Sequence, residues 1–178
     1  MKNSVIKLAT KKSIVVILSV IYLVCNSTVT FAQRANFSGN WVINIEKSEF
    51  GKAPLYTVSK ELKIEQKEDS LNIVAYSTNQ IGEDNPPALT KYKLDGKPTS
   101  KITEDKRKMI TTIQWSGNSR IFTKTSHFSL PNNESQEDYI RTDIWQLSDD
   151  GKTLIIERNV ESKGGKYFIK AIYDKKVM

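Results

Sequence analysis

Cysteine and histidine are almost absent from this sequence of 178 residues. The chain has one cysteine, Cys25, and one histidine, His127. Zinc and copper sites are built mainly from several cysteine and histidine side chains, so no such metal site is expected. A single cysteine can form no disulfide within the chain. A folded domain must therefore be stabilised by its hydrophobic core.

The sequence also lacks a block of basic residues. It contains 27 Lys and Arg against 20 Asp and Glu, a net charge of +7. Four of these lysines fall in the first 32 residues, where there is no acid, so the rest of the chain has 23 basic and 20 acidic residues. These charges alternate in sign along the chain. A nucleic-acid-binding surface needs clustered basic residues, so no nucleic-acid partner is predicted.

Residues 1–32 are typical of an export signal. Four lysines precede or flank the start of the apolar run Ile14 to Val24, which has about half of the roughly 20 residues that span a membrane. Thr30-Phe31-Ala32 then places small residues at the two positions that signal peptidase reads. We predict cleavage after Ala32, with a retained membrane anchor as the alternative.

The predicted mature chain, 33–178, is long enough for one domain with its own core. Val24 fits poorly the cleavage site that would precede a lipidated Cys25, so lipid attachment there is not expected. The predicted location is the periplasm or the extracellular space. No stable membrane span is expected once the signal is removed.

Alternation of apolar and polar residues dominates the mature chain, and helical periodicity is almost absent. Asp95-Gly96, Asp150-Gly151 and Gly164-Gly165 supply the positive φ angles that short hairpin turns need. Ten strands are predicted, at 40–45, 57–66, 70–77, 89–95, 97–103, 108–115, 119–128, 137–147, 152–161 and 166–175. The fold class is therefore all-β.

The hairpin registers agree on which face of each strand is apolar. The predicted opposite pairs are Asp143 with Arg158, Trp145 with Ile156, Val160 with Ile169, Ile113 with Phe122, and Ile64 with Ile73. Such agreement indicates that consecutive strands are neighbours. A sheet of this kind has unpaired edges unless it closes, so we predict an antiparallel up-and-down β-barrel of eight to ten strands. A β-sandwich is the alternative.

Gly39-Asn40-Trp41, at the start of the first predicted strand, resembles the Gly-x-Trp motif of the lipocalin/calycin superfamily. Ser38 to Trp41 with Lys47-Ser48-Glu49-Phe50-Gly51, and later Asp143 to Ser148 with Asp150 to Leu154 and Ile156-Glu157-Arg158, are similar to small exported lipocalin-like proteins of bacteria. The resemblance covers about 38–175. It implies a barrel that often binds a small apolar molecule.

The resemblance also implies structural roles for two residues of the motif. Gly39 and Trp41 would lie at the closed end of the barrel. In lipocalins an arginine from a late strand covers this tryptophan, and Arg158 is the candidate here.

Several inward-facing side chains form a candidate ligand site. These are Arg158, Arg141, Asp143, Trp115, Phe122, Trp145, Tyr92 and Tyr173. Asp143 and Arg158 are predicted to face each other on the apolar side, where an unpaired charge would be costly. They form a structural ion pair, or Arg158 with Arg141 holds the anionic head of a ligand whose tail lies among the aromatic rings.

No catalytic constellation is predicted. His127 is expected near Asp138, but the adjacent Ser126 and Ser129 point elsewhere and no strained nucleophile turn is present. His127 is therefore interpreted as a surface residue. No catalytic residue, metal ligand or cofactor is assigned, and the chain is not expected to be an enzyme.

The predicted function is to bind or carry a small hydrophobic molecule inside the barrel, with a fatty-acid-like anion as one form. The alternative is a filled barrel that acts through its outer surface. An internal cavity of about 300 Å³ or more would favour the first function. A filled interior with an apolar outer patch would favour the second.

Overall fold

The computed structural model describes residues 34–176, so the predicted export signal and its cleavage site lie outside the described residues. Ten strands are present, as predicted. They are β1 (Gly39–Ile43), β2 (Glu61–Gln66), β3 (Ser70–Tyr76), β4 (Ala88–Lys93), β5 (Thr99–Ile102), β6 (Lys108–Trp115), β7 (Ile121–Leu130), β8 (Asn133–Leu147), β9 (Thr153–Ser162) and β10 (Gly165–Lys175). Within this part of the chain, no helix has the length and hydropathy needed to cross a membrane.

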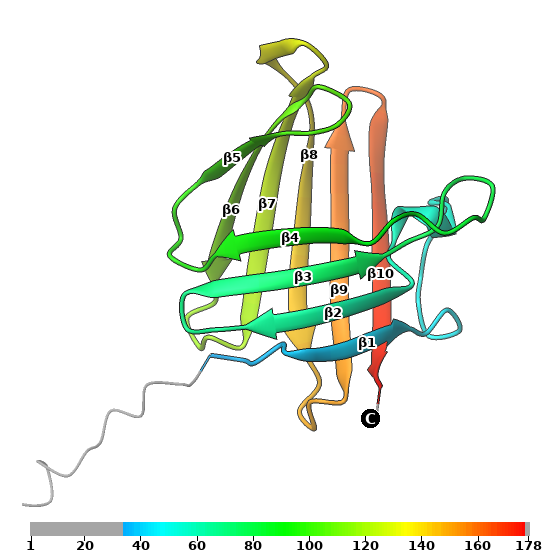
Figure 1. Cartoon of the computed structure of the whole chain (residues 1–178), viewed down its shortest axis with the longest axis vertical. Coiled ribbons are helices and arrows are strands. Elements are labelled where there is room, and N and C mark those ends of the chain that lie inside the picture. The colour runs from blue at the N-terminus through cyan, green and yellow to red at the C-terminus, as the bar shows by residue number, and fades with distance from the viewer. Residues whose placement is uncertain (1–33, 177–178) are drawn as a thin grey trace, which may run out of the picture. The chain divides into compact units, whose positions relative to one another are not determined.

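All ten strands belong to one antiparallel sheet, in the order β4-β3-β2-β1-β10-β9-β8-β7-β6-β5. Every strand pairs with its neighbour in sequence except β4 with β5, and the first strand pairs with the last. Figure 1 shows β1 to β4 crossing in front of the longer β6 to β10. The sheet thus curls into a nearly closed barrel, which confirms the predicted all-β barrel and excludes two separate sheets.

Two predicted registers are confirmed. Asp143 lies opposite Arg158, and Ile64 lies opposite Ile73. Two others are wrong by two residues: Val160 pairs with Tyr167 instead of Ile169, and Phe122 pairs with Trp115 instead of Ile113. A two-residue shift leaves each side chain on the same face, so the interior keeps its predicted composition.

The turns explain these shifts. The β9–β10 turn lies at Lys163-Gly164, because Gly165 already pairs with Ser162. The β6–β7 connection is longer than a two-residue turn. There Ser119 adopts a φ of 56° and the backbone N–H of Ile121 donates to the Ser116 hydroxyl (3.1 Å). This polar loop, and not Gly117-Asn118 alone, sets the register.

Two element boundaries also differ from the prediction. Residues 57–60 were predicted as strand, but Thr57 is the last residue of a 3₁₀ turn, η1 (Leu55–Thr57), and strand pairing starts only at Glu61. The predicted loop 129–136 is largely strand, since β7 extends to Leu130 and β8 begins at Asn133.

Trp41 closes one end of the barrel. Its side chain is 0% exposed, and its Nε1–H donates to the carbonyl of Phe37 (2.9 Å), which is equally buried. The Gln66 side chain anchors this segment, because its Oε1 accepts from the Phe37 N–H (3.0 Å) and its Nε2 donates to the Ala35 carbonyl (2.8 Å). Phe37 is therefore held in place as a plug beside Trp41.

The cation over Trp41 is not the predicted one. Lys175 Nζ lies 5.2 Å from the centre of the Trp41 ring, whereas Arg158 pairs with Asp143. Lys175 is opposite Trp41 in the β1–β10 pairing, which explains its position. Gly39 has a φ of 148°, and a Cβ there would come 2.9 Å from Lys175 Cε. The motif glycine thus provides both a backbone conformation and room for this lysine.

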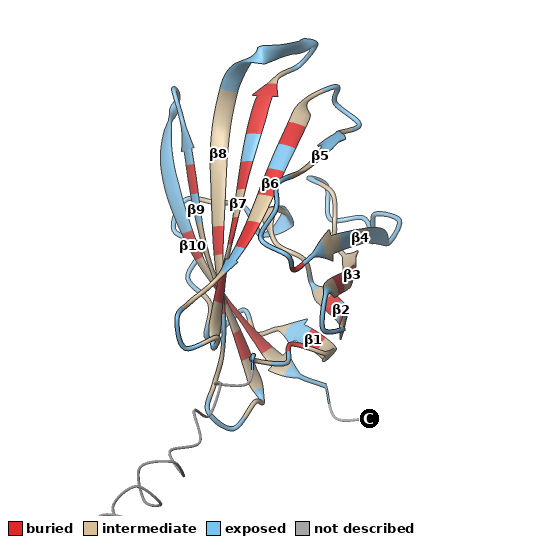
Figure 2. Ribbon diagram, turned by 90° about the vertical axis from the view of Figure 1, so that its left-hand side faces the viewer, coloured by how far each residue is buried: buried red, intermediate tan, exposed pale blue. Residues whose placement is uncertain are grey.

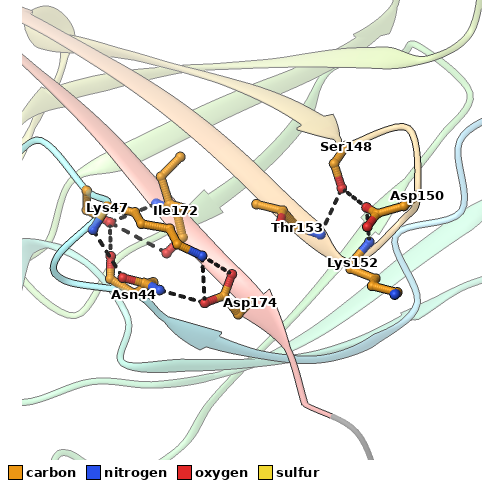
Figure 3. A network of polar contacts seen from close by, with 9 residues as sticks. Asn44, Lys47, Ser148, Asp150, Lys152, Thr153, Ile172 and Asp174 are labelled. Atoms are coloured by element: carbon orange, nitrogen blue, oxygen red, sulfur yellow. Dashed lines mark hydrogen bonds and ion pairs between the residues drawn. The ribbon is translucent and has the colours of Figure 1, made fainter.

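The β1–β10 closure is completed by side chains from the connection after β1 (Figure 3). Ser48 Oγ accepts from the Ile172 N–H (2.9 Å) and donates to the Asn44 carbonyl (2.6 Å). Asn44 Nδ2 in turn donates to Asp174 (2.6 Å), which also pairs with Lys47. The Ser48 hydroxyl therefore takes the place of a backbone hydrogen-bond acceptor where the β1–β10 pairing is interrupted. This contact gives the Lys47-Ser48-Glu49 segment a structural role.

Substituting Trp41 by alanine tests the closed end. Because the ring is fully buried, we expect the free energy of unfolding to fall by about 3–5 kcal/mol. Urea unfolding followed by circular dichroism measures the change. The control is Val42→Ala on the same strand, where the side chain is 38% exposed and a change of about 0.5 kcal/mol is expected. Equal losses of unfolding free energy in the two variants would contradict the assignment of Trp41 to the closed end of the barrel.

Candidate ligand-binding site

Asp143 lies at the centre of a charged cluster inside the barrel and is 0% exposed. Its Oδ1 accepts from Arg158 Nε (2.6 Å), and its Oδ2 lies 2.8 Å from Lys124 Nζ and 3.6 Å from Arg141 Nε. The sheet brings these residues together, because Lys124 on β7 and Arg158 on β9 are the two direct neighbours of Asp143 on β8. The cluster therefore holds three cations and one anion.

Arg158 also binds the connection between β1 and β2. Its Nη1 donates to the Thr57 carbonyl (2.7 Å). Nearby, the Tyr173 hydroxyl donates to the Ser59 carbonyl (3.0 Å). These two bonds fix a segment that is not in the sheet to the charged cluster, and this segment forms part of the wall of the barrel.

The cluster controls the ionisation of its members. Burial by itself would raise the pKa of Asp143, but the charges of Lys124, Arg158 and Arg141 outweigh it and hold the pKa well below its usual range. Burial opposes the charge of Arg158 as well, yet the Asp143 carboxylate raises its pKa. Burial raises the pKa of Tyr173 above its ordinary value. Asp143 and Arg158 are therefore both charged at neutral pH.

A cavity of about 110 Å³ lies next to this cluster. One wall comes from β2, β3 and β4 and the other from β7 to β10. Apolar side chains such as Leu62, Ile73 and Ile156 make up much of the lining, together with the charged Lys124 and Arg158. The volume is below the roughly 300 Å³ that was expected to favour an internal ligand, so the size of the cavity does not by itself support that function.

The charged side chains that line the cavity, Lys124 and Arg158, are both cations. Trp145 lines it and is almost fully buried, and its Nε1–H finds no hydrogen-bond partner among the described residues. Arg141 Nε is also without a hydrogen bond in this part of the chain. The nearby Asp143 carboxylate already contacts Arg158 and Lys124. A group that enters the cavity would therefore meet positive charge.

The structure brings together six of the eight predicted ligand residues. Arg158, Trp145, Tyr92 and Tyr173 line the cavity, and Asp143 and Arg141 complete the charged cluster. Trp115 and Phe122 lie elsewhere. Their rings pack around Phe37 at the closed end, with centroids 6.1 and 5.0 Å from it. The proposed role of each residue in binding stays a prediction.

Lys124 was not predicted from the sequence as a residue of the site. It is buried, it contacts Asp143, and it lies 5.4 Å from the centre of the Tyr92 ring. The sequence does contain a signal for it, because Lys124 lies between Phe122 and Ser126 in the series of inward-facing residues of one strand. A lysine at such a position must find a buried counter-charge, and the β7–β8 register supplies it.

His127 is exposed, as predicted, but its partner is different. Its Nδ1 lies 2.6 Å from Glu137 Oε2, while Asp138 pairs with Arg107. The register of β7 and β8 shifts after Phe128, which moves Asp138 away from the histidine. Within residues 34–176 no group of three or more His, Cys, Asp or Glu side chains could hold a metal ion.

A larger groove, of about 500 Å³, lies on the outside of β1 to β4. Its lining includes Lys63, Lys91, Lys175 and Lys176 together with Glu65. All four lysines are exposed to solvent. Water and salt screen such charges strongly, in contrast to the buried cluster.

Replacing Asp143 by asparagine tests the cluster. The change leaves three cations close together without their anion, so we expect the free energy of unfolding to fall by about 3–5 kcal/mol. The matched control is Asp149→Asn, whose ion pair with Arg120 is exposed and should contribute about 0–1 kcal/mol. Urea unfolding near neutral pH measures both. A loss at Asp143 no larger than at Asp149 would contradict the cluster.

The low pKa of Asp143 also predicts a pH dependence. A carboxyl group whose pKa is lowered by folding stabilises the protein fully above its unfolded pKa of about 3.9, and this contribution is lost as the pH falls below that value. The free energy of unfolding should therefore fall more steeply between about pH 5 and pH 2.5 in the wild type than in Asp143→Asn. Parallel curves for the two proteins would show that the carboxylate is not stabilised.

Comparison with known proteins identifies the fold of this chain but assigns it to no protein family. No protein-family model and no curated protein matches the sequence. Among solved structures, zebrafish ileal bile acid-binding protein in complex with cholic acid is similar, with 16% identity, a TM-score of 0.50, and coverage of 79% of this chain and 98% of that one. Secretory abundant heat soluble protein 4 from Ramazzottius varieornatus has 13% identity, a TM-score of 0.46, and coverage of 82% and 99%. The first likeness shows that this chain has a calycin-like β-barrel fold.

Proposed function

We propose that the barrel binds a small organic anion in the cavity beside Asp143, and that it does so as an exported, non-catalytic binding protein. The observation that supports the proposal is the composition of the buried cluster. One carboxylate is surrounded by Lys124, Arg158 and Arg141. The cluster thus holds two more positive charges than negative charges.

This surplus favours a binding site over a simple structural ion pair. A buried aspartate needs one well-placed cation, and Arg158 alone provides a charge-assisted hydrogen bond at 2.6 Å. Additional buried cations cost free energy unless an anion compensates them. A ligand carboxylate near Lys124 and Arg158 would supply that compensation and an acceptor for the Trp145 N–H.

The outer groove supports the alternative function less well. Its lysines are exposed, so each would contribute little to binding at physiological salt. The side chains of Lys124 and Arg158 are only 7% and 19% exposed, so they interact more strongly with an anion than the exposed lysines of the groove. A barrel of this fold has been solved in complex with cholic acid, so the fold itself is compatible with binding a small organic acid.

Native mass spectrometry of the protein purified from its own producing cells tests this function. We expect a fraction of the wild-type protein to carry a small acidic molecule, identified after denaturation. In Lys124→Met this fraction should fall about tenfold, while Asp143 keeps Arg158 as its partner and the fold is maintained. The control, Lys91→Met, removes a lysine from the outer groove and should leave binding unchanged.

Two results would contradict the proposal. An adduct that persists in Lys124→Met but disappears in Lys91→Met would place the ligand on the outer face. Absence of any adduct, together with unchanged melting temperatures in the presence of organic acids, would favour a barrel without a ligand.

A further inference from the structure

We infer that the internal site selects compact anions, namely short-chain monocarboxylates with about four to nine non-hydrogen atoms, and excludes long-chain fatty acids. The inference rests on the proposed function, because it concerns the same cavity. It adds the size and shape of the ligand, which the charges alone do not set. Three features of the cavity carry it.

The first feature is volume. An engineered protein cavity of about 150 Å³ binds benzene, whereas ligands of drug size occupy about 300–1,000 Å³. The cavity here measures about 110 Å³. It can hold a carboxylate with a few carbon atoms, or one planar ring after a small adjustment, but not an extended acyl chain.

The second feature is that specific contacts bound two sides of the cavity, which is partly open to solvent elsewhere. Toward the closed end of the barrel, Trp145 stacks on Phe122 with ring centroids 4.9 Å apart, and Phe37 packs against both rings. These rings leave no continuous channel for a chain to follow, since Phe37 and Phe122 are almost fully buried.

The segment that follows η1 bounds another side of the cavity. Val58 and Ser59 line it directly. This segment is held by the bonds from Arg158 to the Thr57 carbonyl and from Tyr173 to the Ser59 carbonyl. A longer ligand that left the cavity here would have to break two largely buried hydrogen bonds, and one of them involves the arginine that would bind its carboxylate.

The third feature is the distribution of polar groups. Lys124 and Arg158 line one small space together with Trp145, and the remaining lining is largely apolar, as at Leu62, Ile73 and Ile156. A carboxylate can accept from these donors while a short, preferably branched, apolar group contacts the aliphatic side chains. Small inorganic anions would leave the apolar lining without contacts and are expected to bind more weakly.

The experiment is a titration of the wild-type protein with carboxylates of increasing size, followed by the indole N–H signals in two-dimensional NMR spectra. The chain has three tryptophans, and Trp145→Phe identifies the signal of Trp145. The probes are formate, butyrate, isovalerate, benzoate, decanoate and palmitate, with butyramide as the uncharged control. We expect isovalerate, butyrate or benzoate to bind at least about tenfold more tightly than formate, decanoate, palmitate or the amide.

A second pair of variants tests whether cavity size sets this preference. Ile73→Ala enlarges the cavity, and Ile73→Val does so by a single carbon in case the alanine variant fails to fold. Either substitution should shift the preferred carboxylate toward longer chains, with a larger shift for alanine. Val74→Ala changes the next residue, which faces the outer groove, and should leave the preference unchanged.

The outcomes separate the inference from the function on which it rests. If palmitate or decanoate binds as tightly as butyrate in the wild type, the size selection is wrong and the anion-binding function remains. If butyramide binds as tightly as butyrate, the ligand does not need a negative charge and that part of the inference is wrong. If no carboxylate perturbs the Trp145 signal at any concentration up to about 50 mM, a very weak affinity, the proposed function itself is overturned.

Discussion

The buried carboxylate of Asp143 is the constraint on which the interior of this barrel depends. A charge that is completely removed from water must be compensated by groups of opposite charge, and the sheet provides them from both neighbouring strands. Because Lys124, Asp143 and Arg158 form one row across β7, β8 and β9, a one-residue slip of any of these strands would leave buried charges unpaired. The cluster thus specifies the register as well as the chemistry of the site.

The same cluster connects the sheet to the rest of the barrel. Arg158 reaches the Thr57 carbonyl across the interior, so the irregular segment between β1 and β2 is positioned by a side chain from β9. At the other end, Gln66 and Lys175 fix Phe37 and Trp41. The apolar plug, the charged centre and the wall beside it therefore belong to one interior. Figure 2 shows buried positions alternating with more exposed ones along β6 and β7.

Much of the fold followed from local patterns. Alternating residues and turn-forming glycines predicted ten strands and most of their neighbours, and the Asp150-Gly151 turn predicted the pairing of Asp143 with Arg158. The hairpin predicted at Asp95-Gly96 is wrong, because β4 and β5 do not pair and form the two edges of the sheet. The other turns that failed as predictors, at Gly117-Asn118 and Gly164-Gly165, are ones where polar side chains or a strand glycine move the hairpin by two residues. The predicted cation over Trp41 was wrong for a related reason, because the β1–β10 pairing places Lys175 there.

The sequence by itself determined the strands, the inward face of each strand and the presence of buried charge, because these depend on residue alternation and short turns. Only the tertiary structure decided that Lys124 joins Asp143, that Trp115 and Phe122 pack at the closed end, and that the cavity is small. Lys124 meets Asp143 through the pairing of the neighbouring strands β7 and β8, whereas the packing of Trp115 and Phe122 around Phe37 and the size of the cavity depend on segments from different parts of the barrel. Their distances are set by how the sheet curls, and no local pattern in the sequence records that curvature.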